Sequence, residues 1–446
     1  MCVRTTLFVI LIVLTSAQAQ TLGEIMQLVD TNPQLKTAEQ KSRAAKTRYA
    51  SQQSANYPSL DAVYSATYLF EKPVVYLSTP GAPAAAEVQI QSQNQYDGAL
   101  RLSYPLFTGF AASSAIDMSK SAMQRSRLEA EDVRRNLYLG TVNAYASAVA
   151  AEQFQSAQQK ALAAIKKSYA KAKGMSEQGM LPPSELYRIE AGYHATESAL
   201  IRAKNRYRIA LNALSFLADT SVSEVSALPQ YRDLGEEQVL TQALEKRPDL
   251  QALKKILSMQ QSRVELEKSG YYPTVTLYAQ LAQHGDDWRL DGDGYTNKDR
   301  SAAGFTVNYN LFEGFKSRYA IEAAREEELS VRWMITSYEE EIKKEIRESY
   351  LNFASLKSQL EAQRAQVKAR EAYYDFVKGQ FDNQLTDADQ LSRAISSLAA
   401  ARSALAGAEA RTYAAYAQML LQVDVQTFQD ALYPARRASE KSRRDE

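Results

Sequence analysis

The sequence is short of several residue types, and each shortage excludes a class of protein. Its only cysteine is Cys2, and it contains two histidines, so neither a disulfide framework nor a cysteine–histidine zinc site is expected. The 53 lysines and arginines balance 52 aspartates and glutamates, and no basic excess points to nucleic acid. The 12 prolines and 17 glycines are few for 446 residues, which favours very long helices.

A long apolar run is also missing. Beyond the N-terminus no stretch is apolar for about 18 residues, so no helix is expected to cross a bilayer. The first residues do contain a short apolar run from Leu7 to Leu14, preceded by Arg4 and followed by the triplet Ala17-Gln18-Ala19. This order predicts a signal peptide over residues 1–19 and export from the cytoplasm. Cys2 lies on the wrong side of the apolar run for lipid attachment and would leave with the signal.

What the sequence does contain is an internal repeat. Three motifs recur in the same order about 205 to 215 residues later. The pairs are Asn32-Pro33-Gln34-Leu35 with Arg247-Pro248-Asp249-Leu250, Tyr57-Pro58-Ser59-Leu60 with Tyr272-Pro273-Thr274-Val275, and YPLFTGF at 104–110 with YNLFEGF at 309–315. We predict two structural repeats, 20–218 and 237–424, joined by a linker at 219–236 and followed by a C-terminal tail at 425–446.

Each repeat is expected to run helix, strand, loop, strand, long helix, tip and helix. Period-two alternation, which is typical of a strand with one apolar face, occurs four times. The alternating segments are Leu60 to Tyr68, Gly98 to Leu106, Val275 to Leu281 and Phe305 to Leu311. Strands of about ten residues suit a tilted bilayer crossing. The alternative is a soluble sandwich that buries the apolar face.

A loop containing Pro73, Pro80 and Pro83 is expected between the first two strands. After each strand pair comes an unbroken helical stretch, and the one from Ala111 to Gln178 would be roughly 100 Å long. Two apolar stripes along it, one through Leu137 and one through Tyr138, predict two helical neighbours. Such a helix suits a closed ring of helices, and an ordinary four-helix bundle is the alternative.

Two turns are expected at the tips of the long helices. In the first, Gly179 follows the helix end, Pro182 and Pro183 fix the turn, and one of them or Ser184 caps the next helix. The second turn spans residues 383–391 and offers Asp387 and Asp389 as caps. If three chains converge there, the carboxylates at the tips, including Glu185, would form acidic rings that favour cations and hold a gate.

No catalytic motif is recognisable. Neither a G-x-S-x-G elbow nor a glycine-rich phosphate loop occurs, so we expect no enzyme and no cofactor. The loop Asp286 to Asp299 resembles a calcium site superficially, but it lacks the acidic ligands in register and the terminal glutamate. An exposed loop is the favoured interpretation, although the sequence leaves open whether the segment 284–301 binds an ion. His194 is expected on the surface, and the basic run from Arg436 to Arg444 in a solvated tail.

Together these motifs resemble those of the TolC-family outer membrane efflux proteins, also called outer membrane factors. The resemblance rests on the helix starts, the Y-P-x-L strand entries, the two strand-to-helix junctions and the tip turns, and it covers essentially the whole mature chain. The family's tip pattern, G-x-x-x-x-x-[DE]-[LV], is matched by Gly179, Glu185 and Leu186. The second tip departs from it, because the glycine is replaced near Gln384 and Asp389 lies one place off.

The resemblance implies an α+β membrane protein with internal duplication. A long α-helical barrel would adjoin a transmembrane β-barrel to which each protomer of a homotrimer gives four strands. The implied function is the outer membrane channel of a tripartite efflux or type I secretion system, a passive duct gated at its periplasmic tips. The implied partners are a periplasmic adaptor, an inner-membrane pump or ABC exporter, and lipid. The implied location is the outer membrane of a Gram-negative bacterium, extending into the periplasm.

Two groups of residues are singled out by this resemblance. The expected tip, gate and adaptor contacts are Gly179, Pro182, Pro183, Ser184, Glu185, Leu186, Asp387, Asp389 and Leu391. The expected barrel-to-helix junctions are Pro58, Pro105, Gly109, Pro273 and Gly314.

The residues themselves also favour an oligomer. Four strands cannot close a barrel, and an open strand edge is not tolerated in lipid. If the strands span a membrane, Asp61, Arg101, Gln280 and Asn308 are expected to face water. The alternative function is a periplasmic coiled-coil scaffold or adaptor whose strands form a soluble domain.

Overall fold

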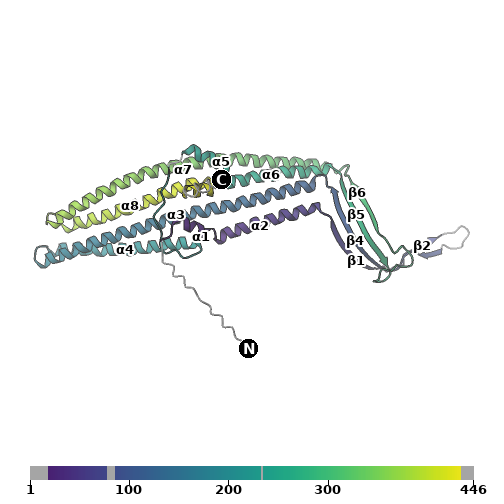
Figure 1. The fold of residues 1–446 in the computed structure, drawn as a ribbon, viewed down its shortest axis with the longest axis horizontal. Helices are drawn as coiled ribbons and strands as arrows, with labels where there is room; N and C mark the ends of the chain where they lie inside the picture. The colour runs from purple at the N-terminus through teal and green to yellow at the C-terminus, as the bar shows by residue number, and fades with distance from the viewer. Residues whose placement is uncertain (1–18, 78–85, 233–234, 433–446) are drawn as a thin grey trace, which may run out of the picture. The chain divides into compact units, whose positions relative to one another are not determined.

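The computed structural model describes residues 19–77, 86–232 and 235–432, and Figure 1 shows the arrangement of the elements. The predicted signal peptide with Cys2, the loop prolines Pro80 and Pro83, and the basic run from Arg436 to Arg444 lie outside these residues. The chain divides into two compact units. The strand unit comprises Lys41–Arg127 and Ala252–Thr336, and the helical unit comprises the described residues up to Gln40, Leu128–Gln251 and those from Ser337 onward.

The two repeats have the same order of elements. The first contains α2 (Pro33–Gln53), η1 (Ser54–Asn56), β1 (Ser59–Tyr68), β4 (Asn94–Phe107), α3 (Ala111–Glu177) and α4 (Pro183–Ala218). The second contains α6 (Pro248–Lys268), η2 (Ser269–Tyr271), β5 (Thr274–Gly285), β6 (Ala302–Asn308), α7 (Lys316–Asp382) and α8 (Ala388–Leu421). The long helices α3 and α7 both have 67 residues, as the lack of internal proline permits.

A short helix precedes each of these series, α1 (Leu22–Val29) before α2 and α5 (Glu236–Lys246) before α6, and α9 (Val425–Leu432) follows the second. Helix α1 begins with a reciprocal capping box between Thr21 and Glu24, which satisfies two backbone N–H groups. The segment between α4 and α5, expected as a linker, is held by a parallel bridge between Val225 and Gln20. Helix α9 takes up the first eight residues of the segment expected as a tail, and its Phe428 is buried.

One antiparallel sheet with the order β1-β4-β5-β6 lies in the strand unit, together with the helix segments next to it in the chain. The pairing places Arg101 directly opposite both Asp61 and Gln280. Leu100 lies opposite both Ala62 and Leu281 in the same way. Because opposed residues point to the same face, the sheet has one polar and one apolar face, as the period-two pattern predicts. Asn308, opposite Thr274, shares the polar face.

Two strand predictions need correction. The proline-rich segment expected as a loop contains a small hairpin of β2 (Val74–Leu77) and β3 (Ala86–Gln89), whose Val75 and Val88 are paired. Strand β6 ends at Asn308 and not at Leu311 as expected, because β5 offers no partner beyond Thr274. A strand persists only where a neighbouring backbone completes its hydrogen bonds.

None of the helices in the described part of the chain carries an apolar stretch long enough to cross a membrane. The core of the helical unit instead packs many alanines with a few large side chains. Tyr138 and Tyr145 are among the largest fully buried residues. They lie about two helical turns apart on α3. Small residues let helices approach closely, so this composition suits long, tightly packed helix pairs.

Candidate functional site

The first tip turn joins α3 to α4. Gly179 adopts the left-handed conformation with φ of 74°, and the N–H of Met180 reaches back to the carbonyl of Met175 at 2.9 Å. This closure satisfies the last carbonyls of α3. Pro182 occupies the N-cap of α4 with Pro183 at the first helical position. Ser184 was one of the candidate caps, but it lies inside the helix, and no side chain caps this end.

The second tip turn repeats this geometry with different residues. Gln384 has φ of 60°, and the N–H of Leu385 donates to the carbonyl of Gln380 at 2.8 Å. Asp387 is the N-cap of α8, and its carboxylate accepts the N–H of Gln390 at 2.7 Å. Asp389 lies in the first turn and forms an ion pair with Arg393 at 2.5 Å. Gln384 therefore takes the backbone role of Gly179, as expected from the replacement seen in the sequence.

Two polar contacts join the tips to each other. The Glu185 carboxylate in the first tip accepts the N–H of Ala388 at 3.3 Å, at the start of α8 in the second tip. Glu185 thus supplies negative charge to the positive end of a helix from the other repeat. Lys171 on α3 donates to the Asp382 carboxylate on α7 at 2.7 Å. The two hairpins are consequently cross-linked at their ends.

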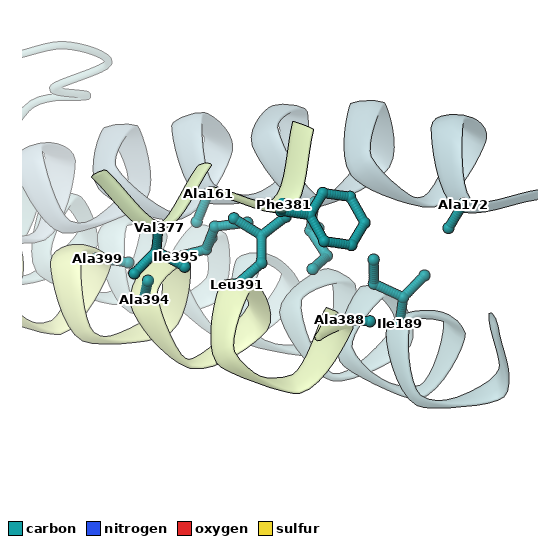
Figure 2. Close-up of a cluster of buried hydrophobic side chains, with 11 residues drawn as sticks. Ala161, Ala172, Ile189, Val377, Phe381, Ala388, Leu391, Ala394, Ile395 and Ala399 are labelled. Atoms are coloured by element: carbon teal, nitrogen blue, oxygen red, sulfur yellow. The ribbon is translucent and has the colours of Figure 1, made fainter. Parts of the chain in front are cut away.

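A common apolar cluster lies behind these contacts. Figure 2 shows Ile189 from α4 and Phe381 from α7 lying near Leu391 and Ala388 from α8. The buried members are Ala161, Ile165, Ala172, Ile189, Val377, Phe381, Ala388, Leu391, Ala394, Ile395 and Ala399. Leu186 packs against the cluster from its border. Among the predicted tip residues, Leu186, Leu391 and Glu185 therefore come together, whereas Asp389 points away to Arg393.

Tip residues that the sequence analysis missed include Tyr169, Glu190 and the Lys171–Asp382 pair. Tyr169 stacks on Tyr193 with ring centroids 5.9 Å apart, and its hydroxyl donates to Glu190 at 3.2 Å. Burial and the neighbouring Glu190 carboxylate raise the pKa of Tyr169. The signal for Tyr169 is its helical spacing of four from Ile165, but the partner on α4 cannot be read from one sequence.

The apolar face of the sheet is exposed in the single chain. Leu60, Leu281 and Phe305 belong to this face, and each is 69% exposed. A soluble sheet would bury such a face against another layer. Exposed aromatic residues gather near both ends of the strands: Tyr68, Phe70 and Trp288 near one end, and Tyr57, Tyr272 and Phe315 near the other. An apolar band between two aromatic girdles is typical of strands that cross a bilayer.

The five predicted junction residues lie where the strands meet the helices. Pro58 and Pro273 directly precede β1 and β5, and Pro105 lies beside a register shift in β4. Gly109 and Gly314 have φ of 61° and 67°, and the phenylalanine after each also has positive φ. This backbone is rare for a residue with a side chain, and its occurrence in both repeats shows that the junction has been built twice.

A buried ion cluster in the helical unit surrounds the R-P-D-L motif of the second repeat. Arg247 donates to Asp249 at 3.0 Å and to Glu345 at 2.7 Å, and Arg135 donates to Asp249 at 3.0 Å. Burial acts to lower the pKa of Arg247, but the carboxylates outweigh it and the pKa is raised. Burial and Asp249 raise the pKa of Tyr338 to about 12. The cluster ties α3, α6 and α7 together.

A second missed cluster orders the β5–β6 loop. His284 is fully buried, with Nδ1 3.0 Å from Asp97 and Nε2 3.2 Å from Asp293. Burial acts to raise the pKa of Asp293, but the N–H donors of Thr296 and Tyr295 and the His284 ring outweigh it, so the pKa lies well below its usual range. The sequence pattern does not single out His284, and a zinc site with so few histidines and cysteines was not expected. His194, expected on the surface, is exposed and pairs with Glu197.

The acidic part of the same loop contains an arginine partner of its own. Asp286, Asp287 and Asp291 place carboxylate oxygens within 4.8 Å of one another. The Arg289 guanidinium lies 2.7 Å from Asp287 and 3.9 Å from Asp291. It lowers the pKa of Asp287 through a hydrogen bond from its side chain. Arg289 thus pairs with two of the three aspartates of this group.

Comparison with known proteins gives one consistent picture. The family model described as outer membrane efflux protein matches residues 25–219 and 239–421. None of the curated proteins compared matches the chain. Among solved structures, the Campylobacter jejuni CmeC outer membrane channel aligns at 17% identity with a TM-score of 0.73, over 92% of this chain and 86% of that one.

Two further solved structures agree. The outer membrane protein VceC of Vibrio cholerae aligns at 16% identity and a TM-score of 0.71, over 91% of this chain and 95% of its own. The MtrE outer membrane channel of Neisseria gonorrhoeae, in its open state, aligns at 16% identity and a TM-score of 0.71, over 90% and 88%. At this identity the likeness establishes a shared α+β fold of long helices and a strand sheet.

Proposed function

Because the chain belongs to the outer membrane efflux protein family, we propose that it forms the outer membrane channel of a tripartite efflux or type I secretion system. In this proposal the duct is passive, the strands lie in the outer membrane, and the helical repeats extend into the periplasm. Cargo moves under the drive of an inner-membrane pump or ABC exporter, reached through a periplasmic adaptor that contacts the helical tips.

The observation that carries the proposal is the exposed apolar face of the sheet. Leu60, Leu281 and Phe305 face outward on that side, while Asp61, Arg101 and Gln280 line the other. Lipid on the apolar side and water on the polar side would satisfy both faces at once. The alternative, a periplasmic scaffold with a soluble strand domain, requires a second layer over the apolar face, and the described residues supply none.

The edges of the sheet support the proposal of a homotrimer. The outer edges of β1 and β6 have unpaired backbone groups in a single chain, and such groups are too costly to leave open in lipid. Three copies with four strands each would close a barrel of the size seen among outer membrane proteins. The exposed stripe on α4, formed by Tyr187, Ile201, Ile209 and Phe216, and the stripe on α7, including Leu351 and Phe376, also suit neighbouring copies.

The tips are the proposed gate. Glu185 and Lys171 link the two hairpins of a protomer at their ends, and the apolar cluster fills the space behind them. Opening would require these contacts to separate. A partner protein that binds the tip residues could therefore open the duct by breaking them. Polar links are suited to this role because water replaces them at small net cost in free energy.

Fractionation combined with electrophoresis tests the proposal. The mature protein is expected in the outer membrane fraction as an oligomer that dissociates to a monomer band only on heating in detergent. A soluble scaffold would appear in the periplasmic fraction and would show no heat-dependent change in mobility. Recovery of the protein as a soluble periplasmic species would overturn the channel assignment.

A further inference from the structure

The first half of the β5–β6 loop folds back over the apolar face of the sheet. Gly98 on β4 lies opposite Tyr64 on β1, and both belong to the apolar face. A Cβ added at Gly98 would lie 2.5 Å from Leu290 Cδ1, so the Leu290 side chain occupies the space that a larger residue would fill. The Tyr64 hydroxyl donates to the Trp288 carbonyl at 3.3 Å. We name residues 287–291 the clasp, because this segment lies against the face.

The chain that follows the clasp is held on the polar face. A Cβ added at Gly285, at the end of β5, would lie 2.9 Å from Leu290 Cα, and Gly285 also forms a bridge with Gly292. Gly292 has φ of 108°, a backbone that favours glycine. Beyond it, Asp293 Oδ2 lies 3.2 Å from His284 Nε2 on the polar face. The loop therefore contacts the end of β5 from both faces, and the clasp has a defined place.

The apolar face of β5 ends at the level of the clasp. Along β5, the positions on this face that precede the clasp are Val275, Leu277, Ala279 and Leu281. The next position is Gln283, which is exposed and lies opposite Gly98. An amide side chain is costly in hydrocarbon, because nothing there forms hydrogen bonds with it. If the apolar face meets lipid, as proposed, the hydrocarbon layer ends near Gln283, beside the clasp.

The side chains of the clasp suit a lipid headgroup layer. Trp288 is 74% exposed, and the Arg289 side chain is 62% exposed between Asp287 and Asp291. Tryptophan is enriched where membrane meets water, because its ring is apolar and its N–H is polar. Charged side chains cost little near the headgroups and much more in hydrocarbon. A copy joined at β1 or β6 would continue the sheet in its own plane, whereas the clasp lies on the face, so the arrangement favours lipid as its neighbour.

We infer that the clasp lies in the headgroup layer of the outer leaflet, with Trp288 and Arg289 in contact with lipid headgroups. The packing of Leu290 on Gly98 and Gly285 then fixes the depth at which the sheet sits in the bilayer. This inference rests on the proposed function, because it requires lipid on the apolar face. It assigns the first half of the β5–β6 loop to the membrane surface, where the sequence suggested only an exposed loop.

Tryptophan fluorescence tests this position, because the chain contains only two tryptophans, Trp288 and Trp333. In Trp333→Phe the clasp supplies the only reporter. The oligomer is reconstituted in phosphatidylcholine vesicles whose acyl chains carry bromine, a quencher, either close to the headgroup or close to the bilayer centre. The emission of Trp288 is expected to fall several-fold more with the shallow bromines than with the deep ones, because the clasp lies at the level of the headgroups.

The matched control is Trp288→Phe, which leaves Trp333 as the reporter. Trp333 is 67% exposed and lies about five turns into α7, beyond the strands. It is expected to be quenched by acrylamide in the water and by neither brominated lipid.

A second variant moves the clasp without changing the reporter. In the same single-tryptophan background, Gly285→Ala places a methyl group against the Leu290 backbone and should push the clasp off the face. Quenching of Trp288 by the shallow bromines is expected to fall, and quenching by acrylamide to rise. Gly304→Ala is the control, because its methyl group would meet the Tyr278 hydroxyl on the polar face, away from the clasp. Unchanged quenching in Gly285→Ala would overturn the role of Leu290 in setting the depth.

The outcomes separate the clasp from the proposed function. Each protein is first tested for the heat-dissociated oligomer and for flotation with the vesicles. If the oligomer floats and acrylamide alone quenches Trp288, the clasp faces water and the inference is wrong, while the channel proposal stands. If neither quencher reaches Trp288, a neighbouring copy covers the clasp and the inference is wrong as well. If the unsubstituted protein forms no oligomer and does not float, the proposed function fails and the inference fails with it.

Discussion

At the scale of single residues, the helical unit depends on polar groups that are buried with their partners. Tyr145 is fully buried, and its hydroxyl donates to the Ser226 carbonyl at 2.7 Å. Burial raises the pKa of Tyr145 from 10.0 to about 12. The folded protein therefore favours the neutral phenol of Tyr145. Once the unfolded chain loses this proton, keeping it in the folded state costs free energy, and the folded protein becomes less stable relative to the unfolded chain.

The sign of the resulting pH dependence follows from linkage. Stability from Tyr145 is fully present below pH 10, where the unfolded tyrosine is protonated, and is lost as the pH rises to about 12. At about 1.4 kcal/mol per pKa unit, the loss is about 2 to 3 kcal/mol. Tyr145→Phe should show a smaller fall in the denaturant midpoint between neutral and alkaline pH, with exposed Tyr187→Phe as the control. Equal falls in both variants would contradict the assignment.

At the same scale, Glu185 is the residue through which one tip stabilises the other. Glu185→Gln removes the charge from the N-terminus of α8 while keeping a hydrogen-bond acceptor near Ala388. The expected loss is about 0.5 to 1 kcal/mol of helix-end stabilisation, which should lengthen channel openings in planar bilayers. Glu197→Gln, which removes a partner of exposed His194 on the same helix, serves as the control. Identical open times in the two variants would remove Glu185 from the gate.

At the scale of elements, strand β5 carries both faces of the sheet in adjacent residues. Leu281 lies on the exposed apolar face, and Gln280 lies opposite Arg101 on the polar face. In lipid, Leu281→Arg is expected to cost up to about 4 kcal/mol per copy, depending on its depth in the bilayer. It should strongly reduce the heat-dissociated oligomer in outer membranes, whereas Thr276→Arg, on the polar face of the same strand opposite Thr306, should be tolerated. Equal tolerance would mean that no lipid covers the apolar face.

The elements also show where local sequence patterns suffice. Strands β1, β4 and β5 follow their period-two alternation, and α3 follows its proline-free stretch from Ala111 to Glu177. The early end of β6 at Asn308 is different, because the sequence from Tyr309 to Leu311 alternates as well as its counterpart in β4. Alternation predicts that a segment can pair, but only a neighbouring strand decides that it does.

At the scale of the whole molecule, the acidic groups of the second tip would act on ions only if several copies brought them together. Asp387 caps α8 and Asp389 pairs with Arg393 in the single chain. Converged in a trimer, they would form rings of negative charge. Asp387→Ala with Asp389→Ala is expected to alter the single-channel conductance or lower the preference for cations.

A cap-preserving variant separates charge from helix stability. Asp387→Ser combined with Asp389→Ala keeps an N-cap acceptor and removes the same charges. If the ring of charge acts on ions, both double variants should change cation preference alike. If the serine variant behaves as the unsubstituted protein, or if both leave conductance unchanged, the two aspartates serve only as helix caps and ion-pair partners.

The sequence by itself determined the duplication, the element order and the two faces of the sheet, because these depend on spacing between residues close in the chain. It also placed Gly179 at the end of a helix, since left-handed backbone favours glycine, and the family resemblance indicated Gly109 and Gly314 as strand-to-helix junctions. Only the tertiary structure decided which distant groups meet. The bond from Glu185 to Ala388, the burial of His284 between Asp97 and Asp293, and the Arg247 cluster join segments far apart in sequence. Their energies depend on distances that no local pattern encodes.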